Sequence, residues 1–304
     1  MNGIKQGSIA SPTLFCVYLD VVLDQLRKDG IGCRVGEQFY GCLVYADDVV
    51  LLSPTIHGLQ RMVRTCEKTC RQLDIEFNAS KSMCMRFLPR GRDVPDVSIT
   101  LGENELGWMT CVKHLGNYLQ CDLGEETEIR KKRGEMFGRT NALLGVFSTT
   151  KRHLISRLFH AQCCHHYGAQ AWNLRDPNVG RYSTAYNSCV RRLFKLPRRT
   201  HTRFLPLITK RRPVIDVVYA ASLKNIVNMS TSDNMAVLNI YEHAMNDCTS
   251  LMYENHRIIS NHQEFIESDD DRATVTAILE LMFSPPECFD SDEALQLANF
   301  LCIF

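Results

Sequence analysis

The spacing of apolar residues predicts two amphipathic helices in the first part of the chain. Apolar side chains recur at helical spacing over 15–26 and over 59–73. The first helix is expected to begin near Pro12, because proline is tolerated at the first helical position, and to end at Gly30.

Shorter apolar and alternating runs lie between and after these helices and predict strands. Two strands are expected within 39–53, joined tightly at Ala46-Asp47-Asp48. Other strand-like runs lie at 75–77, 83–87, 97–101 and 112–119. After about Gly124 the pattern is helical to the end, with breaks near Pro177, Pro197, Pro213 and Pro285. The expected fold class is therefore α+β, with the strands confined to the first part.

The stretch "LVYADDVVLLS", residues 43–53, places two adjacent carboxylates inside an apolar run. Asp47 and Asp48 would repel each other in a buried strand and would resist desolvation. One explanation is a turn in which the aspartates cap backbone N–H groups in solvent. The other is a site where divalent cations neutralise the carboxylates. The residues of this stretch alone leave both explanations open.

The charged residues are unevenly distributed, although the net charge is only +1 and the composition is that of an ordinary globular chain. The segment between Asp176 and Asp216 contains Lys and Arg residues but no Asp or Glu. From Glu264 to Glu293 the chain is acidic, with Arg272 as its single Lys or Arg residue. This distribution predicts a surface that faces a polyanion and a separate acidic end.

The cysteines and the N-terminus indicate an intracellular protein, without distinguishing nucleus from cytoplasm. The 14 cysteines are irregularly spaced and no CxxC motif occurs, so we expect mostly free thiols in a reducing compartment. "MNGIKQGS" lacks the pattern of a signal peptide, and no apolar stretch is long enough to span a bilayer. A membrane partner is therefore not expected.

Four segments occur in an order that resembles a known polymerase family. They are "GIKQGSIASPTLF" at 3–15, "YADD" at 45–48, "NASKS" at 78–82 and "CVKHLGNYL" at 111–119. Together they resemble motifs B, C, D and E of a reverse transcriptase palm, most closely that of non-LTR (LINE-type) retrotransposons. "CCHHYGAQAW" at 163–172 and "VRRLFKLPRRTHTRFLP" at 190–206 look like the helical region behind such polymerases.

The resemblance implies three parts and covers the chain to about residue 220. Residues 1–124 would be a partial palm, ferredoxin-like but without its first strand. Residues 125–220 would be a helical thumb and basic region, and residues 221–304 a helical acidic C-terminal region. Loss of the first strand would leave the Tyr-Ala-Asp-Asp hairpin with an unpaired edge.

The resemblance also implies the chemistry of RNA-directed DNA synthesis. Two Mg²⁺ ions (or Mn²⁺) stabilise the attacking and leaving oxygens during nucleotide addition. Asp47 is expected to be a direct metal ligand and Asp48 a supporting ligand. The implied partners are an RNA template, a DNA primer and deoxynucleoside triphosphates.

Other residues receive roles by the same resemblance. Tyr45 would lie close to the nascent base pair, and Lys81 would neutralise or protonate the departing pyrophosphate. Gln6 and Gly7 would approach the template and the incoming nucleotide, where glycine permits a close backbone contact. A lysine that follows a strand is otherwise an ordinary solvated residue.

The family's palm carries a further metal-binding aspartate in motif A, upstream of motif B. That strand is absent here, and the acidic residues Asp20 and Asp24 on the first helix are expected to point to solvent or to cap a turn. We therefore expect a reverse transcriptase fragment that is inactive alone. Its Asp47–Asp48 pair would be exposed or would bind metal only weakly.

Two clusters have competing explanations. The residues His160, Cys163, Cys164, His165 and His166 suggest zinc, but they are expected within one or two helical turns, and packing around Tyr167 and Trp172 also explains them. The basic residues within 190–212, called the basic block below, form either a nucleic-acid surface or a solvated face. Its candidate binding residues are Arg191, Arg192, Lys195, Arg198, Arg199 and Arg203. Two further functions stay open, a non-catalytic nucleic-acid-binding remnant and a recruited host interaction module.

Overall fold

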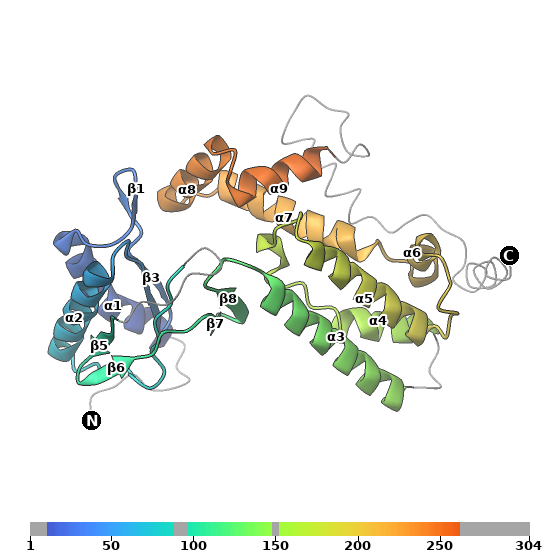
Figure 1. Ribbon diagram of the computed structural model, residues 1–304, viewed down its shortest axis with the longest axis horizontal. Helices are drawn as coiled ribbons and strands as arrows, with labels where there is room; N and C mark the ends of the chain where they lie inside the picture. The colour runs from blue at the N-terminus through green and yellow to red at the C-terminus, as the bar shows by residue number, and fades with distance from the viewer. Residues whose placement is uncertain (1–10, 88–96, 148–151, 262–304) are drawn as a thin grey trace. The chain divides into compact units, whose positions relative to one another are not determined.

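The computed structural model describes residues 11–87, 97–147 and 152–261 of the chain (Figure 1). The chain divides into two compact units. The N-terminal unit comprises Met1–Val112 and Gln120–Leu123, and the C-terminal unit comprises Lys113–Leu119 and Gly124–Phe304. The predicted loop at 89–95, the break at Pro285 and the acidic stretch from Glu264 lie outside the described residues.

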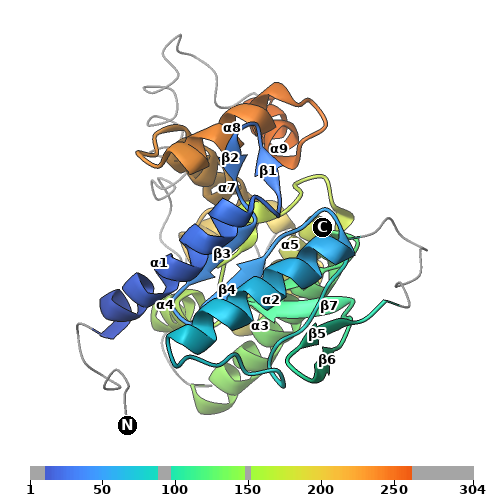
Figure 2. The same ribbon diagram turned by 90° about the vertical axis from the view of Figure 1, so that its left-hand side faces the viewer.

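The two predicted amphipathic helices are present in the N-terminal unit. Helix α1 spans Ser11–Asp29 and ends at Gly30, whose φ of 67° is unfavourable for most other residues. Helix α2 spans Ile56–Gln72 and begins after Thr55, whose side-chain oxygen accepts the N–H of Gly58 at 3.0 Å. Figure 2 shows the two helices running beside the third and fourth strands.

The strands of the described chain form separate antiparallel pairs rather than one sheet. In chain order they are β1 (Arg34–Val35), β2 (Gln38–Phe39), β3 (Cys42–Tyr45), β4 (Asp48–Leu51), β5 (Ile99–Leu101), β6 (Asn104–Leu106), β7 (Cys111–His114) and β8 (Asn117–Gln120). The mixed α+β class is confirmed. Three of the strand pairs lie where the sequence predicts strands. They are β3 with β4 within 39–53, β5 with β6 near 97–101, and β7 with β8 near 112–119.

Two apolar clusters hold the N-terminal unit together, and α2 contributes residues to both. The first joins α1, α2 and the β3–β4 hairpin through buried residues such as Leu26, Met62 and Cys66. The second surrounds Ile99 of β5. Next to it, the Gln60 amide donates to the Thr100 carbonyl at 2.9 Å and accepts the Thr100 N–H at 2.8 Å. This side chain ties α2 to β5.

The strands predicted at 75–77 and 83–87 are wrong. The N–H of Ile75 donates to the Cys70 carbonyl at the end of α2, at 3.0 Å, so it is used locally. Residues 83–87 form a single isolated bridge, between Cys84 and Trp108. Ile75 and Phe77 pack against the cluster shared by α1 and α2, whereas Met83 and Phe87 are 47% and 48% exposed. The alternation in the sequence therefore has no continuous partner strand and no single buried face.

The C-terminal unit is helical, as predicted. Its elements are α3 (Glu126–Val146), α4 (Arg152–Gln162), η1 (Ala169–Ala171), α5 (Pro177–Leu193), η2 (Thr202–Phe204), α6 (Leu205–Thr209), α7 (Val214–Ser230), α8 (Met235–Asn246) and α9 (Leu251–Ser260). Pro177 begins α5 after the N-cap Asp176, and Pro213 precedes α7. Pro197 follows the end of α5, so these three predicted breaks are confirmed.

Helix α5 is the central helix of this unit and packs against α3, α4, α6 and α7. Trp172 is 2% exposed and packs edge-on against Tyr182 of α5, with ring centroids 5.2 Å apart. The buried Asn255 of α9 donates to the Trp172 carbonyl at 2.7 Å and accepts the Leu174 N–H at 3.1 Å. One amide thereby joins the last described helix to the segment before α5.

Candidate functional site: an exposed carboxylate hairpin

The Tyr-Ala-Asp-Asp stretch forms the tip of the β3–β4 hairpin. Tyr45 is opposite Asp48, and Val44 is opposite Val49, so the loop between the strands consists of Ala46 and Asp47. This confirms the tight connection predicted at this place. Ala46 has a φ of 52°, a left-handed conformation that two-residue hairpins use and that side chains other than glycine rarely adopt.

The two faces of the hairpin differ in burial. Cys42, Val44, Val49 and Leu51 belong to the cluster shared with α1 and α2. Opposed residues share a face, so Tyr45 and Asp48 point away from that cluster together. Tyr45 is 66% exposed and Leu43, on the same face, is 50% exposed.

Both carboxylates are exposed to solvent. Their charges therefore carry little of the desolvation cost that a buried strand would impose. Exposure is one of the two alternatives that the sequence predicts for this pair. The hairpin thus presents Asp48, Tyr45 and the turn residue Asp47 at an accessible tip.

Carboxylate oxygens are the donor type that Mg²⁺ prefers, so Asp47 and Asp48 suit a divalent ion chemically. Within the described residues, however, no group of three or more His, Cys, Asp or Glu side chains is placed to hold a metal ion. Asp20 and Asp24 are both exposed on α1, and Asp24 pairs with Arg27 at 3.4 Å. The residues present therefore do not form a complete two-ion site.

The "NASKS" segment forms a local turn. The Asn78 side-chain oxygen accepts the N–H groups of Ser80 and Lys81, at 3.0 and 3.3 Å. Lys81 is exposed in this turn, and among the described residues no ion pair joins it to Asp47 or Asp48. Gln6 and Gly7 lie outside the described residues.

The six candidate residues of the basic block fall into two groups. Three contact their own chain. Arg191 donates to the Thr200 carbonyl, Arg192 donates to the Asn141 side chain at 2.6 Å, and the Arg203 guanidinium lies 4.8 Å from the Phe204 ring centroid.

The other three, Lys195, Arg198 and Arg199, are exposed in the turn that follows α5. In the part of the chain that the structure describes, none of the three forms an ion pair within 4.0 Å. Arg192 and Arg203 are exposed as well, so the two groups differ in their contacts with the chain and not simply in exposure.

The histidine–cysteine cluster is distributed differently from the prediction. Helix α4 contains His160 and ends at Gln162, so Cys163 to His166 lie in a turn and an irregular segment, and the helical placement of these four residues was wrong. His160 contacts the Tyr186 hydroxyl at 2.7 Å through Nε2, and burial lowers the pKa of this imidazole. Trp172 is buried as expected, whereas Tyr167 is 59% exposed and is not a packing centre.

The thiols of the described cysteines are free, as the spacings predicted. Burial raises the pKa of Cys42 to about 11, which disfavours its thiolate. Among the described residues, no helix is both long and apolar enough to cross a bilayer.

Comparison with known proteins gives matches to the first part of the chain. Residues 1–119 match the family described as "Reverse transcriptase (RNA-dependent DNA polymerase)". A Pol polyprotein from a type-1 retrotransposable element R2 of Nasonia vitripennis is 34% identical over 92 residues, which are 30% of this chain and 9% of the relative.

Two further relatives agree. The type-1 R2 Pol polyprotein of Popillia japonica is 34% identical over 91 residues, 30% of this chain and 13% of the relative. The Pol polyprotein from the type-2 element R2DM of Drosophila melanogaster is 34% identical over 80 residues, 26% of this chain and 8% of the relative. The matched segment thus corresponds to a small share of each polyprotein.

Proposed function

We propose that the β3–β4 hairpin is the metal-facing element of an RNA-directed DNA polymerase palm, because residues 1–119 match the reverse transcriptase family and the chain is similar to Pol polyproteins of R2 elements. The observation that carries the proposal is the register that places Tyr45 opposite Asp48 at an exposed two-residue turn. Asp47 is the proposed direct ligand of Mg²⁺ or Mn²⁺, and Asp48 supports it.

The remaining residues take roles around this hairpin. Tyr45, exposed on the same face as Asp48, is proposed to lie beside the primer end. Lys81 is proposed to neutralise the departing pyrophosphate, and Gln6 and Gly7 to contact template and incoming nucleotide. The proposed partners are RNA, a DNA primer and deoxynucleoside triphosphates.

We further propose that this chain does not synthesise DNA by itself. In-line nucleotidyl transfer needs carboxylates that converge on two ions. The described residues supply the exposed pair at the hairpin and no third ligand beside it.

Primer extension tests the catalytic part of the proposal. The full chain is incubated with an RNA template, an annealed DNA primer, deoxynucleoside triphosphates and Mg²⁺ or Mn²⁺, and no extension is expected. Extension by the chain that disappears in Asp47→Asn would show that the chain is active. Extension that persists in Asp47→Asn identifies a contaminating polymerase.

Localised oxidative cleavage tests the metal-facing role independently. Fe²⁺ replaces Mg²⁺, and ascorbate with hydrogen peroxide then generates radicals that cut the backbone near the bound ion. We expect fragments that end near residues 45–49, mapped by mass spectrometry, and their loss in Asp47→Asn/Asp48→Asn. The control Asp20→Asn/Asp24→Asn removes the same charge from α1 and should preserve the fragments. Cleavage elsewhere only would contradict the proposed role.

A second candidate function is binding of nucleic acid without catalysis, through Lys195, Arg198 and Arg199. The observation that favours it is that these three side chains are exposed and form no ion pair within the described residues, whereas Arg191, Arg192 and Arg203 contact their own chain. Such binding would be electrostatic and would weaken as salt increases.

A further inference from the structure

Helix α2 carries a basic face that the proposed polymerase chemistry does not use. Its buried residues are Gly58, Met62, Val63, Cys66, Thr69 and Cys70. Its exposed cations are Arg61, Arg64, Lys68 and Arg71. At 100° per residue, the four cations occupy an arc of about 80° opposite the buried residues, over about 15 Å of helix. These four residues are called the α2 basic face below.

The nearby acidic groups compensate these cations only in part. Glu67 accepts the N–H of Gly102 in the β5–β6 turn, so its carboxylate is held toward that turn. Asp29 accepts hydrogen bonds from Thr65 and Gln25, which lower the pKa of its carboxyl, and the charges of Arg61 and Lys68 lower it further. Asp29 therefore compensates part of the charge of these two cations, and Arg64 and Arg71 are not among its charge partners. Within the described chain, no ion pair within 4.0 Å involves any residue of the α2 basic face.

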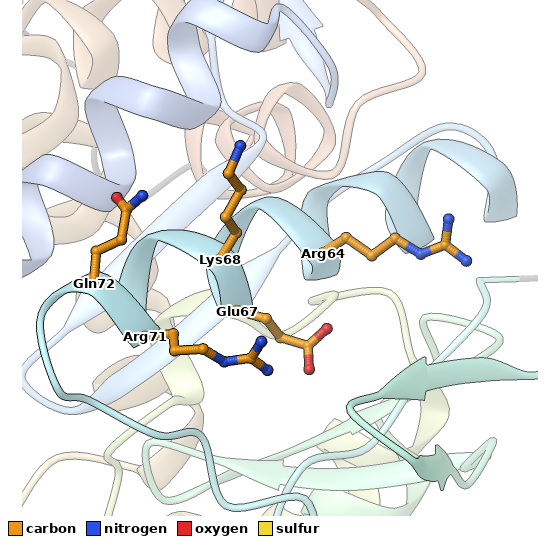
Figure 3. Close-up of a pocket in the computed structure, with 5 residues that line it drawn as sticks. All are labelled: Arg64, Glu67, Lys68, Arg71 and Gln72. Atoms are coloured by element: carbon orange, nitrogen blue, oxygen red, sulfur yellow. The ribbon is translucent and has the colours of Figure 1, made fainter.

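A hollow of about 370 Å³ lies along this helix. Figure 3 shows its lining residues, with Lys68 and Gln72 extending to one side of α2 and Glu67 and Arg71 to the other. Arg64 lies one turn closer to the start of the helix. The hollow leaves space between cationic groups that a chain of anionic groups can occupy.

We propose that the α2 basic face binds the phosphate backbone of single-stranded nucleic acid. Three of its four cations are arginines, whose planar guanidinium pairs with phosphate through two parallel hydrogen bonds. Helix α2 contains no Phe, Tyr or Trp on which a base would stack, so the proposed contact is to the phosphates. Phosphate contacts carry no sequence information, so binding should be independent of base sequence.

The choice of nucleic acid among polyanions rests on the proposed function of the chain. An anionic membrane is disfavoured by the structure, because an interfacial helix inserts its apolar face, whereas the apolar face of α2 is buried in two clusters. This surface belongs to the N-terminal unit and is separate in sequence from Lys195, Arg198 and Arg199.

The test measures binding of the full chain to a fluorescein-labelled RNA of about 20 uridines by anisotropy, over a series of salt concentrations. Each phosphate contact on a single strand contributes about −0.7 to the slope of log K against log salt. The variant Arg64→Gln/Lys68→Gln/Arg71→Gln should therefore make the slope less steep by about 2. The single variant Arg64→Gln should reduce it by about 0.7.

A matched control removes three exposed cations from helices of the C-terminal unit, as Arg130→Gln/Arg157→Gln/Lys224→Gln. Its net charge equals that of the α2 variant, so a general charge effect would change both slopes equally. Circular dichroism verifies that each variant is folded, and Arg64→Gln serves as the test if the triple variant unfolds.

Several outcomes would overturn the inference. They are an unchanged slope in the α2 variants, an equal loss in the control, loss of the whole slope in Lys195→Gln/Arg198→Gln/Arg199→Gln, or absence of RNA binding by the unaltered chain at low salt. Binding to vesicles containing phosphatidylserine that requires the α2 basic face, while RNA binding does not, would assign it to a membrane. None of these results bears on metal-directed cleavage at the hairpin, so a failure here is distinguishable from failure of the proposed function.

Discussion

The guanidinium of Arg191 donates two hydrogen bonds to the carbonyl oxygen of Thr200, from Nε at 3.0 Å and from Nη2 at 2.9 Å. Nη2 also contacts the Thr202 hydroxyl at 3.1 Å. Thr200 is 1% exposed, so the arginine satisfies a carbonyl of a buried residue at the end of the turn after α5. Arg191 therefore holds the turn that presents Lys195, Arg198 and Arg199.

Replacement of Arg191 should reduce stability. Arg191→Ala leaves the Thr200 carbonyl without these donors, which should lower the free energy of unfolding by about 1–3 kcal/mol. The exposed Arg199→Ala should change it by less than about 0.5 kcal/mol. Urea denaturation followed by circular dichroism compares the two. Equal midpoints for both variants would show that Arg191 has no structural role.

Lys195, Arg198 and Arg199 should determine any salt-dependent RNA binding by the basic block. Lys195→Gln/Arg198→Gln/Arg199→Gln should make the slope of log K against log salt less steep by about 2, at unchanged stability. Arg192→Gln, at a side chain already bonded to Asn141, should change this slope by much less. Anisotropy with the same labelled RNA measures both. A larger effect of Arg192→Gln would reverse the assignment.

Local patterns predicted the helices and the hairpin, but not the partners of individual side chains. Helices α1 and α2 and the β3–β4 turn follow from spacing that each segment carries itself. The alternation at 75–87 failed because a strand needs a partner strand, and here only Cys84 has a bridge, to Trp108. The distribution of charge along the sequence likewise makes Arg191 and Arg199 look equivalent. Only the folded chain shows that Arg191 donates to the Thr200 carbonyl.

Asn255 should be a critical buried amide of the C-terminal unit. It is 3% exposed and bonds to the Trp172 carbonyl and the Leu174 N–H. Asn255→Leu leaves both backbone groups unpaired, so unfolding should become easier by about 2–4 kcal/mol. Thermal denaturation should show a clear decrease of Tm, whereas Asn246→Ala, at an exposed position of α8, should have little effect. A similar Tm for Asn255→Leu and the original chain would contradict this role.

Glu125 and His166 should give opposing pH dependences in the C-terminal unit. The Glu125 carboxylate accepts the Asn173 N–H at 2.6 Å, and burial raises the pKa of its carboxyl to about 7. Burial, with His160 and other cationic neighbours, lowers the pKa of His166 to about 4. In the folded state Glu125 therefore loses its proton at a higher pH than in the unfolded state. His166 gains its proton in the folded state only at a lower pH than in the unfolded state.

The signs follow from proton binding in the two states. For Glu125 the unfolded chain holds fewer protons between pH 4.5 and about 7, so stability falls as pH rises through this interval. For His166 the unfolded chain holds more protons between about 4 and 6.5, so stability falls as pH decreases. The two contributions oppose each other between pH 4.5 and 6.5.

Substitution should separate these contributions. Glu125→Gln retains an acceptor for the Asn173 N–H and removes the carboxyl, so its stability should increase more steeply from pH 4.5 to 6.5 than that of the original chain. Urea midpoints at several pH values measure this difference. His166→Asn should instead leave the downward trend caused by Glu125. Parallel pH profiles for all three proteins would show that neither group is coupled to folding.

Ala46 should store strain at the tip of the carboxylate hairpin. Its φ of 52° costs about 1–2 kcal/mol for an L-residue, and glycine accepts this conformation freely while losing more entropy on folding. Ala46→Gly should therefore stabilise the chain by about 0.5–1 kcal/mol, and the β-branched Ala46→Val should destabilise it. If the left-handed residue positions Asp47 for a metal ion, Ala46→Gly should also preserve Fe²⁺-directed cleavage near residues 45–49. Destabilisation by glycine, or cleavage that moves to another segment, would show that the turn does not place Asp47 in this way.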